Sequence, residues 1–457
     1  MSKKQRKYSV KELSALAQIN LNAAGIDIGQ DKNYVAVPGG RDEESVREFG
    51  TFTPDAEALI RWLKECKVDT VAMESTGVYW IPLYEMLESA GFEVYLVNAR
   101  HVKNVTGRKS DVLDCQWLQQ LHTYGLLQAS FRPVAQIAAL RAVVRQREML
   151  VRYRAAHIQH MQKALQLMNI QLTQVLSDIV GVTGMTIIRA IIAGEHNPQR
   201  LAAYRNGQCK HSEAEIAKAL TGNYRQEHLF ALQQAVELFD FYGQQLAACD
   251  GQLEKLYQQG GVTVEPTVPF VPKKKKRRKN QPHFDLQKAL YRLVGVDLTD
   301  VDGFDTLTVQ TLISEIGTTV EAWPTVKHFT SWLGLSPNNK ITGGKVIGRR
   351  TKKTANRANT AFRVAAQSVA RSNSAVGAFY RRKKAHLGPA KAIVATAHKL
   401  ARIFYVMLKR REPYQDPGAS YYEEQYRQRA IRNLQRKAAK LGLQLEPIYS
   451  STQTGVS

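Results

Sequence analysis

The spacing of the hydrophobic residues changes at Pro133, and this change constrains the fold more than any other feature of the sequence. Before Pro133, short runs rich in Val, Ile and Tyr alternate with helical segments. Such alternation predicts an α/β domain with a mixed sheet, whose first three strands form an antiparallel meander. After Pro133, apolar residues recur every seven positions. A heptad repeat predicts a long helix that packs lengthwise against another, as in a coiled coil.

The α/β pattern can be divided into individual elements. We expect two strands joined by a tight turn within residues 23–38, and further strands at residues 45–52, 70–75 and 93–98. Helices are expected at residues 55–65 and 79–90, the second closed by Gly91. Each strand is short and bounded by turn residues, as is typical of such domains.

The heptad segment has an irregular seam. One heptad position holds Ile137, Val144, Val151, Ile158 and Leu165, and the other holds Leu140, Met161 and Met168. Arg147 and Arg154 interrupt the second row, so the seam is either imperfect or faces a charged partner there. A second helical segment at residues 212–256 is expected to pair with the first as an antiparallel arm.

These patterns predict six segments. They are a lead-in at residues 1–20, an α/β domain at 21–132, a helical and coiled-coil region at 133–259, a basic linker at 260–285, a helical domain at 286–415, and a helical and polar tail at 416–457. Within the helical domain, Val301–Gly317 fits either a helix-hairpin-helix whose turn binds a phosphate or an ordinary pair of helices.

The positive charge is concentrated in two places. The chain has a formal net charge of +24, and residues 322–411 contain 20 Lys and Arg without one Asp or Glu. Residues 273–279, KKKKRRK, add seven more. These 27 charges exceed the whole net excess, so the remaining chain is close to neutral. Focused positive charge predicts a nucleic-acid partner, although a solvated basic surface is the simpler alternative.

Other features exclude whole classes of protein. No apolar run approaches the roughly 18 residues that a membrane span requires, and the basic start is not followed by the apolar stretch of a secretion signal. The four cysteines are scattered without a CxxC pair. This argues against a disulfide scaffold or a zinc ribbon, and we expect a cytoplasmic protein with no membrane contact.

Four carboxylates stand where a sheet and a helix could bring them together. Asp27 lies between Ile26 and Ile28 in a strand, and Glu74 ends another strand. Asp111 and Asp114 are three residues apart in a helical segment and therefore share a face. Converging carboxylates suit Mg²⁺ or Mn²⁺, which take oxygen ligands and activate phosphoryl transfer. Taken alone, Asp111 could simply cap its helix.

A glycine-containing loop with many cations lies in the acid-free region. In residues 334–359, Gly343 and Gly344 permit a close approach of backbone to a ligand, and Ser336 and Thr342 carry hydroxyls. Thr342 could otherwise merely hydrogen-bond within its own turn. The expected phosphate-binding residues are Lys340, Lys345, Arg349, Arg350, Lys352, Lys353 and Arg357 in the loop and Lys273, Lys274, Lys275, Lys276, Arg277, Arg278 and Lys279 in the linker.

Four motifs in this order make the sequence resemble a known family. GIDIGQDKNYVAV, MESTGVYW, GRKSDVLDCQWL and GLSPNNKITGGK resemble the DEDD transposases of bacterial insertion sequences, the IS110 family, and the last motif is most similar to its IS1111 branch. The pilin-gene inverting recombinase is a related protein. The resemblance covers about residues 23–415.

The resemblance implies a mechanism and a set of partners. It implies a RuvC-like, ribonuclease-H-like domain with Asp27, Glu74, Asp111 and Asp114 as the catalytic acids, then a coiled coil and a C-terminal transposase domain. The family's nucleophilic serine, which becomes covalently attached to DNA, matches Thr342 here, with Ser336 as the alternative. The implied partners are double-stranded donor and target DNA, a noncoding guide RNA encoded by the element (the bridge RNA), and further copies of the chain, from dimer to tetramer, with acids and nucleophile from different subunits. The implied location is the bacterial nucleoid.

Three functions remain open from the sequence. The leading hypothesis is an RNA-guided DNA transposase or recombinase that forms a covalent link between Thr342 and DNA. The alternatives are a metal-dependent junction nuclease that uses water, and a nucleic-acid-binding protein without catalysis. An actin-like ATPase is disfavoured because GIDIG is not followed by a second glycine-rich phosphate loop.

Overall fold

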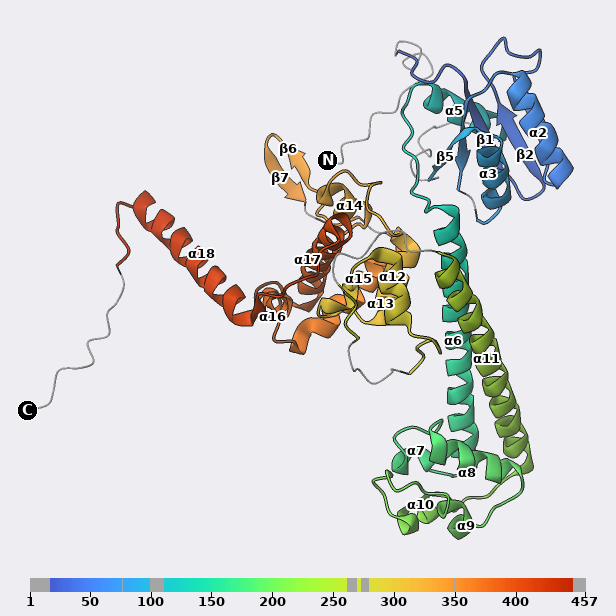
Figure 1. Ribbon diagram of the computed structural model, residues 1–457, viewed down its shortest axis with the longest axis vertical. Helices are drawn as coiled ribbons and strands as arrows, with labels where there is room; N and C mark the ends of the chain where they lie inside the picture. Colours follow the sequence, from blue (N-terminus) through green and yellow to red (C-terminus); the bar gives the residue numbers. More distant parts are fainter. Residues whose placement is uncertain are drawn as a thin grey trace, which may run out of the picture. The chain divides into compact units, whose positions relative to one another are not determined.

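The computed structural model describes residues 17–75, 77–98, 111–260, 269–272, 279–348, 350–352 and 354–446. These residues belong to two compact units, Met1–Arg132 and Pro133–Ser457, whose elements are labelled in Figure 1. The predicted phosphate-binding residues Lys273, Lys274, Lys275, Lys276, Arg277, Arg278, Arg349 and Lys353 lie outside the described residues, as does most of the predicted lead-in.

The first unit is built on a five-stranded sheet. Its strands are β1 (Ala23–Ile28), β2 (Lys32–Ala36), β3 (Val46–Gly50), β4 (Thr70–Glu74) and β5 (Glu93–Val97), in the order β3-β2-β1-β4-β5. β1, β2 and β3 pair antiparallel, and β4 is parallel to both β1 and β5. The mixed sheet with an antiparallel meander is therefore confirmed.

The two faces of the sheet are covered by different helices. The apolar face packs Ile26, Val71 and Met73 against α2 (Thr53–Glu65) and α3 (Trp80–Ser89) in one core. Side chains alternate along a strand, so the residues between these point to the opposite face. That face is covered by α5 (Asp111–Thr123), which packs on β1.

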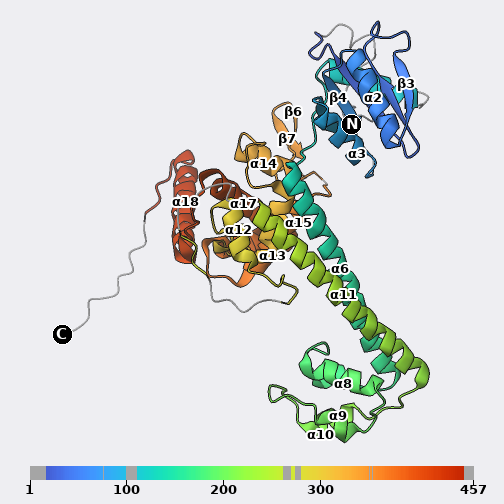
Figure 2. The same ribbon diagram turned by 45° about the vertical axis from the view of Figure 1, so that its right-hand side comes forward.

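The second unit begins with the predicted antiparallel arm, but its second helix starts at Gln226 and not at residue 212, because Glu213–Ala219 forms a separate short helix. α6 (Ala135–Leu167) and α11 (Gln226–Gln259) run antiparallel, side by side in both Figure 1 and Figure 2. Between them lie four short helices, α7 (Leu172–Val175), α8 (Val182–Ile192), α9 (Pro198–Ala202) and α10 (Glu213–Ala219). These pack with the adjoining ends of α6 and α11 around a separate apolar core, which closes that end of the arm.

The arginines that interrupt the heptad seam do face specific partners. The Arg147 guanidinium forms a buried ion pair with Asp250 of α11, with 2.5 Å between Nε and Oδ1. The other Asp250 oxygen accepts a hydrogen bond from the His283 backbone N–H at 3.1 Å. Arg154 instead lies 4.1 Å from the centre of the Phe239 ring. The expectation of a charged partner is thus confirmed at Arg147, whereas Arg154 packs on an aromatic ring.

The rest of the second unit is a cluster of helices around an aromatic core. The elements are α12 (Leu286–Val294), α13 (Thr306–Ile316), α14 (Val326–Trp332), α15 (Arg357–Ser368), α16 (Ala375–Leu387), α17 (Pro389–Arg410) and α18 (Gly418–Lys440). Phe329, Phe362 and Phe404 are fully buried and contact one another ring to ring. A two-stranded hairpin, β6 (Lys340–Thr342) and β7 (Lys345–Gly348), lies between α14 and α15.

The turn before α13 favours the ordinary helix pair over a phosphate-binding hairpin. The Asp305 carboxylate accepts a hydrogen bond from the Thr308 N–H at 2.8 Å and caps α13. A phosphate there would meet this negative charge. Gly303 is required by packing, because a Cβ there would lie 2.8 Å from the Ala365 carbonyl oxygen. Among the described helices, none is long and apolar enough to cross a membrane.

Candidate active site

The position of α5 on the sheet is fixed by a glycine in β1. A Cβ at Gly25 would lie 2.3 Å from both the Cys115 carbonyl oxygen and the Gln119 nitrogen of α5. Only glycine therefore lets the helix backbone lie this close to the strand. At the other end of α5, His122 Nε2 lies 2.8 Å from the Thr70 hydroxyl at the start of β4. The first turn of α5 accordingly lies toward the carboxyl ends of β1 and β4.

All four predicted acids belong to this end of the face that α5 covers. Asp27 is two residues beyond Gly25 on β1, and Glu74 is two beyond Ala72 on β4. Because Gly25 and Ala72 are register partners, Asp27 and Glu74 point to the same face. Asp111 and Asp114 occupy the first turn of α5, where the helix dipole favours negative charge.

The electrostatics of neighbouring groups support this arrangement. Burial raises the pKa of the Cys115 thiol to about 12, and the negative charges of Asp27 and Asp114 add to the increase. The Tyr34 pKa is raised chiefly by its hydrogen bond to Glu48, with a smaller contribution from the charge of Asp111. Tyr34 is the antiparallel partner of Asp27. The carboxylates of β1 and α5 thus act on the same small region.

A metal site at these carboxylates remains a prediction. Carboxylate oxygens are the ligands that Mg²⁺ and Mn²⁺ take, so the chemistry of the donors fits a divalent cation. In the part of the chain that the structure describes, however, no three His, Cys, Asp or Glu side chains lie close enough to hold one ion together. The structure brings the four acids to one end of one face without forming a closed ligand cage.

The second candidate group lies at the tip of the β6–β7 hairpin. Gly343 and Gly344 form its two-residue turn with φ of +55° and +75°, the left-handed pair typical of a type I′ turn. Thr342, the last residue of β6, is exposed and pairs with Lys345 across the strands. Cross-strand partners have Cβ atoms about 4.5–5.5 Å apart, so the Lys345 side chain starts beside that of Thr342 and its ammonium group can reach a phosphate bound there.

Ser336 is in a different situation. Its hydroxyl donates a hydrogen bond to Thr330 Oγ1 at 2.9 Å, and its backbone N–H donates to the Thr330 carbonyl at 3.3 Å. Ser336 is half-buried and helps to close the turn that follows α14. Of the two predicted nucleophiles, Thr342 is therefore the one whose hydroxyl is exposed to a substrate.

The predicted phosphate-binding residues fall into two groups. Lys340, Lys345, Arg350 and Lys352 are exposed and have no carboxylate partner in the described chain. Arg357 instead pairs with Glu148 of α6 at 2.7 Å, and Lys279 pairs with Asp178 at 2.8 Å. The free cations surround the hairpin, whereas the two paired ones connect parts of the second unit.

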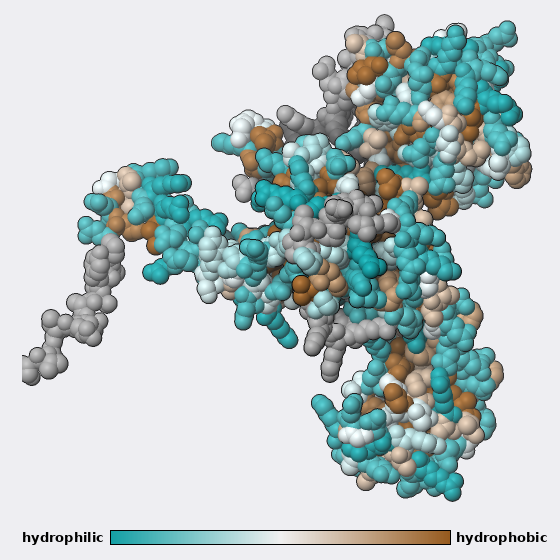
Figure 3. All heavy atoms as spheres, in the orientation of Figure 1, coloured by the Kyte–Doolittle hydropathy of each residue, from teal (hydrophilic) through white to brown (hydrophobic). Residues whose placement is uncertain are grey.

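The hairpin also exposes apolar side chains. Ile341 and Ile347 are 59% and 69% exposed, and brown atoms mark this region in Figure 3. Isolated two-stranded hairpins gain little stability in water. An exposed hairpin that combines apolar and cationic residues is suited to contact a macromolecular partner.

Sequence reasoning missed one polar contact that ties the arm to the helical cluster. Glu315 of α13 is buried and accepts two hydrogen bonds from the Arg145 guanidinium of α6, at 2.8 and 2.7 Å. Arg141 donates to the backbone carbonyls of Ser314 and Glu315, each at 2.9 Å. The signal in the sequence was a single acid within an apolar helix, which is costly to bury unless it is paired.

Comparison with known families decides the identity of the chain. Residues 24–170 match the profile of a DEDD transposase family of the IS110 type, described as a transposase. Residues 296–381 match a second profile, described as the transposase IS116/IS110/IS902 family. The chain belongs to the IS110 family of transposases. The first match contains all four acids and the second contains the Thr342 hairpin, so each of the two candidate groups lies in a matched segment. No curated protein matched the chain.

Membership of the IS110 family makes the chain a DNA transposase, and the resemblance noted from the four motifs is confirmed. Its substrates are therefore DNA. The family also relies on divalent metal, which agrees with the chemistry of the four carboxylates.

Proposed function

We propose that this transposase cuts DNA through a covalent link between the Thr342 oxygen and a DNA phosphate. The observation that carries the proposal is the exposed Thr342 hydroxyl at the tip of a tight hairpin, with Lys345 opposite it and further free cations around it. The Ser336 hydroxyl, by contrast, is held by Thr330.

The proposed chemistry is an exchange of phosphodiester bonds. The Thr342 oxygen bonds to phosphorus, and the bond from phosphorus to the 3′ oxygen of the DNA breaks. The proton leaves Thr342 and a proton is taken up by the departing 3′ oxygen. One ester replaces another, so no water is consumed, and the released 3′-hydroxyl can attack the Thr342 ester of a partner strand to rejoin DNA.

The four carboxylates would serve the same reaction from a RuvC-like, ribonuclease-H-like first unit. Asp27, Glu74, Asp111 and Asp114 would hold Mg²⁺ or Mn²⁺, which supplies positive charge to the scissile phosphate. Lys345 and its neighbours would orient the phosphate beside Thr342. Asp27 and Glu74 lie toward the carboxyl ends of β1 and β4, which is where sheets of this kind commonly bind their ligands.

We further propose that an element-encoded guide RNA selects the DNA sites and that the chain works as a homo-oligomer, from dimer to tetramer. The positive charge is concentrated in the acid-free segment, and phosphate contacts position a nucleic acid without reading its sequence. Base pairing by an RNA would supply the sequence specificity. The arm of α6 and α11 would pack as a coiled coil. We place the protein in the bacterial cytoplasm at the nucleoid.

Trapping of a covalent adduct tests the nucleophile. Purified protein, guide RNA, Mg²⁺ and a labelled DNA substrate should give a species that survives denaturing electrophoresis. Thr342→Ala should abolish it. Ser336→Ala, the matched control that also removes one hydroxyl, should retain it. Thr342→Ser should retain or increase it, because the threonine methyl group crowds the attack.

Several outcomes separate this mechanism from its alternatives. An adduct that persists in Thr342→Ala rules out Thr342. Hydrolysed ends without any adduct would indicate the junction nuclease that uses water. Chelation of divalent metal and Asp27→Asn should each abolish cleavage while DNA binding remains, and full activity in Asp27→Asn would support a role without carboxylate catalysis.

A further inference from the structure

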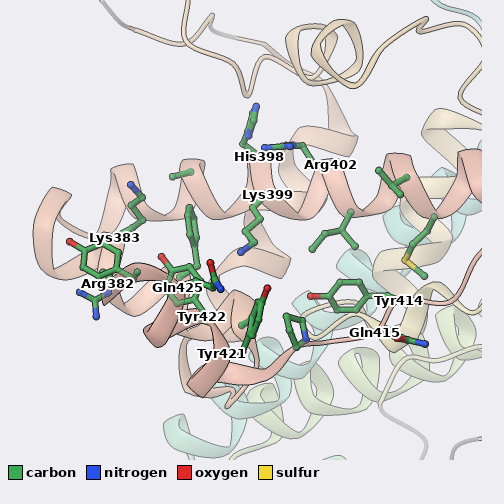
Figure 4. Close-up of a pocket in the computed structure, with 18 of the residues that line it drawn as sticks. Arg382, Lys383, His398, Lys399, Arg402, Tyr414, Gln415, Tyr421, Tyr422 and Gln425 are labelled. Atoms are coloured by element: carbon green, nitrogen blue, oxygen red, sulfur yellow. The ribbon is translucent and has the colours of Figure 1, made fainter. Parts of the chain in front are cut away.

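A large cleft lies between α16, α17 and α18. Its volume is about 850 Å³, and Figure 4 shows its lining side chains. Most of the lining follows residue 381, where the second family profile ends. The four carboxylates and the Thr342 hairpin do not contribute to it. The cleft is therefore a feature that the proposed reaction does not use.

The cleft carries an excess of positive charge. Lys399, Arg402, Arg429 and Lys383 line it, and none of them has an ion-pair partner within the described ranges. Burial lowers the pKa of Lys399, and the nearby positive charges of Arg429 and Arg402 lower it further, while the negative charge of Asp416 partly opposes this shift. The lining carboxylate, Glu412, is already paired with Arg410 at 3.9 Å. The cleft therefore attracts an anion.

The wall opposite α17 is aromatic. Tyr421 and Tyr426 of α18 are 55% and 39% exposed. In Figure 4, Lys399 extends from α17 toward the tyrosines of α18. Its Nζ atom lies 4.9 Å from the centre of the Phe379 ring and 5.0 Å from that of Tyr422. The two rings that Lys399 contacts are largely buried, whereas the exposed Tyr421 ring lines the same cleft as this half-buried ammonium group.

Flat rings next to unpaired cations suit a nucleotide whose base is not paired. In a double helix the base faces are stacked on one another, so a protein ring cannot cover them. An unpaired base offers its face for stacking while its phosphate meets Lys or Arg. We propose that this cleft binds an unpaired nucleotide of the substrate DNA strand, with the base on Tyr421 and the phosphate at Lys399 and Arg429. The proposal rests on the lining of the cleft and on membership of the transposase family, and it does not require Thr342 to be the nucleophile.

Equilibrium binding of the full chain to labelled oligonucleotides tests the proposal. The probes are a single-stranded DNA, the duplex of the same sequence and a single-stranded RNA of equal length, measured by anisotropy without divalent metal so that no cleavage occurs. Tyr421→Ala should weaken single-stranded DNA binding by roughly 5- to 150-fold, the range for loss of one stacked base. Binding to the duplex should change less than about twofold. Lys399→Gln should also lower the salt dependence by about 0.7 in the slope of log K against log salt.

Two controls and three outcomes decide the result. Tyr204→Ala removes a similarly exposed tyrosine, 47% exposed, from the segment after α9, and Lys218→Gln removes an exposed charge from α10. Neither should alter the ratio of single-strand to duplex affinity. Unchanged single-strand binding in Tyr421→Ala would overturn the proposal, as would equal losses for duplex and single strand. A larger loss for RNA than for DNA would show that the assignment to the substrate DNA is wrong.

Discussion

Replacing Gly25 by alanine should displace the helix that carries two of the four acids. The new Cβ would lie 2.3 Å from backbone atoms of Cys115 and Gln119, whereas ordinary contact begins at 3.4 Å. α5 must therefore retreat by about 1 Å, because the contacts are with backbone atoms and not with flexible side chains. Overpacking of this kind costs about 1–3 kcal/mol of stability. A 1 Å misplacement of reacting groups can lower a rate by about 10²-fold.

The assay compares strand cleavage rates and thermal unfolding of Gly25→Ala with those of Gly39→Ala. Gly39 belongs to the same unit, and a Cβ there meets nothing within 4 Å. We expect Gly25→Ala to be folded but to cleave DNA about 10²-fold more slowly, while Gly39→Ala should resemble the wild type. Wild-type cleavage by a folded Gly25→Ala protein would refute the claim that this contact positions Asp111 and Asp114 for the reaction.

Three further predictions concern the arm, the first unit and the hairpin. Asp250→Ala leaves Arg147 buried without a partner and should destabilise the arm by about 3–5 kcal/mol. The measurement is amide hydrogen exchange, which should become faster in α6 and α11. The double variant Arg147→Met with Asp250→Leu should recover most of the protection from exchange. Burial lowers the His122 pKa from 6.5 to about 4, so as the pH falls from 6.5 to 4 the unfolded state binds a proton that the folded state does not. Up to about 3 kcal/mol of unfolding free energy should be lost across this range. The plot of unfolding free energy against pH should therefore be flatter in His122→Phe, and an equally steep plot would contradict this prediction. Gly343→Asn should keep adduct formation and Gly343→Val should reduce it, because the site is open but requires positive φ.

The elements of the first unit could be read from the sequence because each carries a local signal. The strands with alternating apolar and polar residues, the short helices and the antiparallel meander are all predicted by patterns within a few residues. The seven-residue repeat likewise predicted α6, and a charged partner was one of two alternatives for the arginines that interrupt the seam. The identity of the Arg147 partner as Asp250 was not predicted, since the two residues are 103 positions apart.

The candidate site was only partly predictable for the same reason. The four acids were predicted from residue type and position, with Asp27 inside an apolar strand, Glu74 at a strand end, and Asp111 and Asp114 on one face of a helical segment. The role of Gly25, which sets the distance between β1 and α5, depends on contact between distant backbones. Ser336 and Thr342 could not be separated by sequence, because the hydrogen bond to Thr330 that occupies Ser336 arises from the turn after α14. The tyrosines of α18 carried no periodic signal that pointed to a cleft.

The central claim is that the Thr342 oxygen becomes esterified to DNA, and mass spectrometry of the trapped adduct tests it most directly. After nuclease and trypsin treatment, cleavage at Lys340 and Lys345 should release the peptide ITGGK, residues 341–345. The account predicts that this peptide carries a nucleotide phosphate and that fragmentation places it on Thr342. A nucleotide on any other peptide would contradict it.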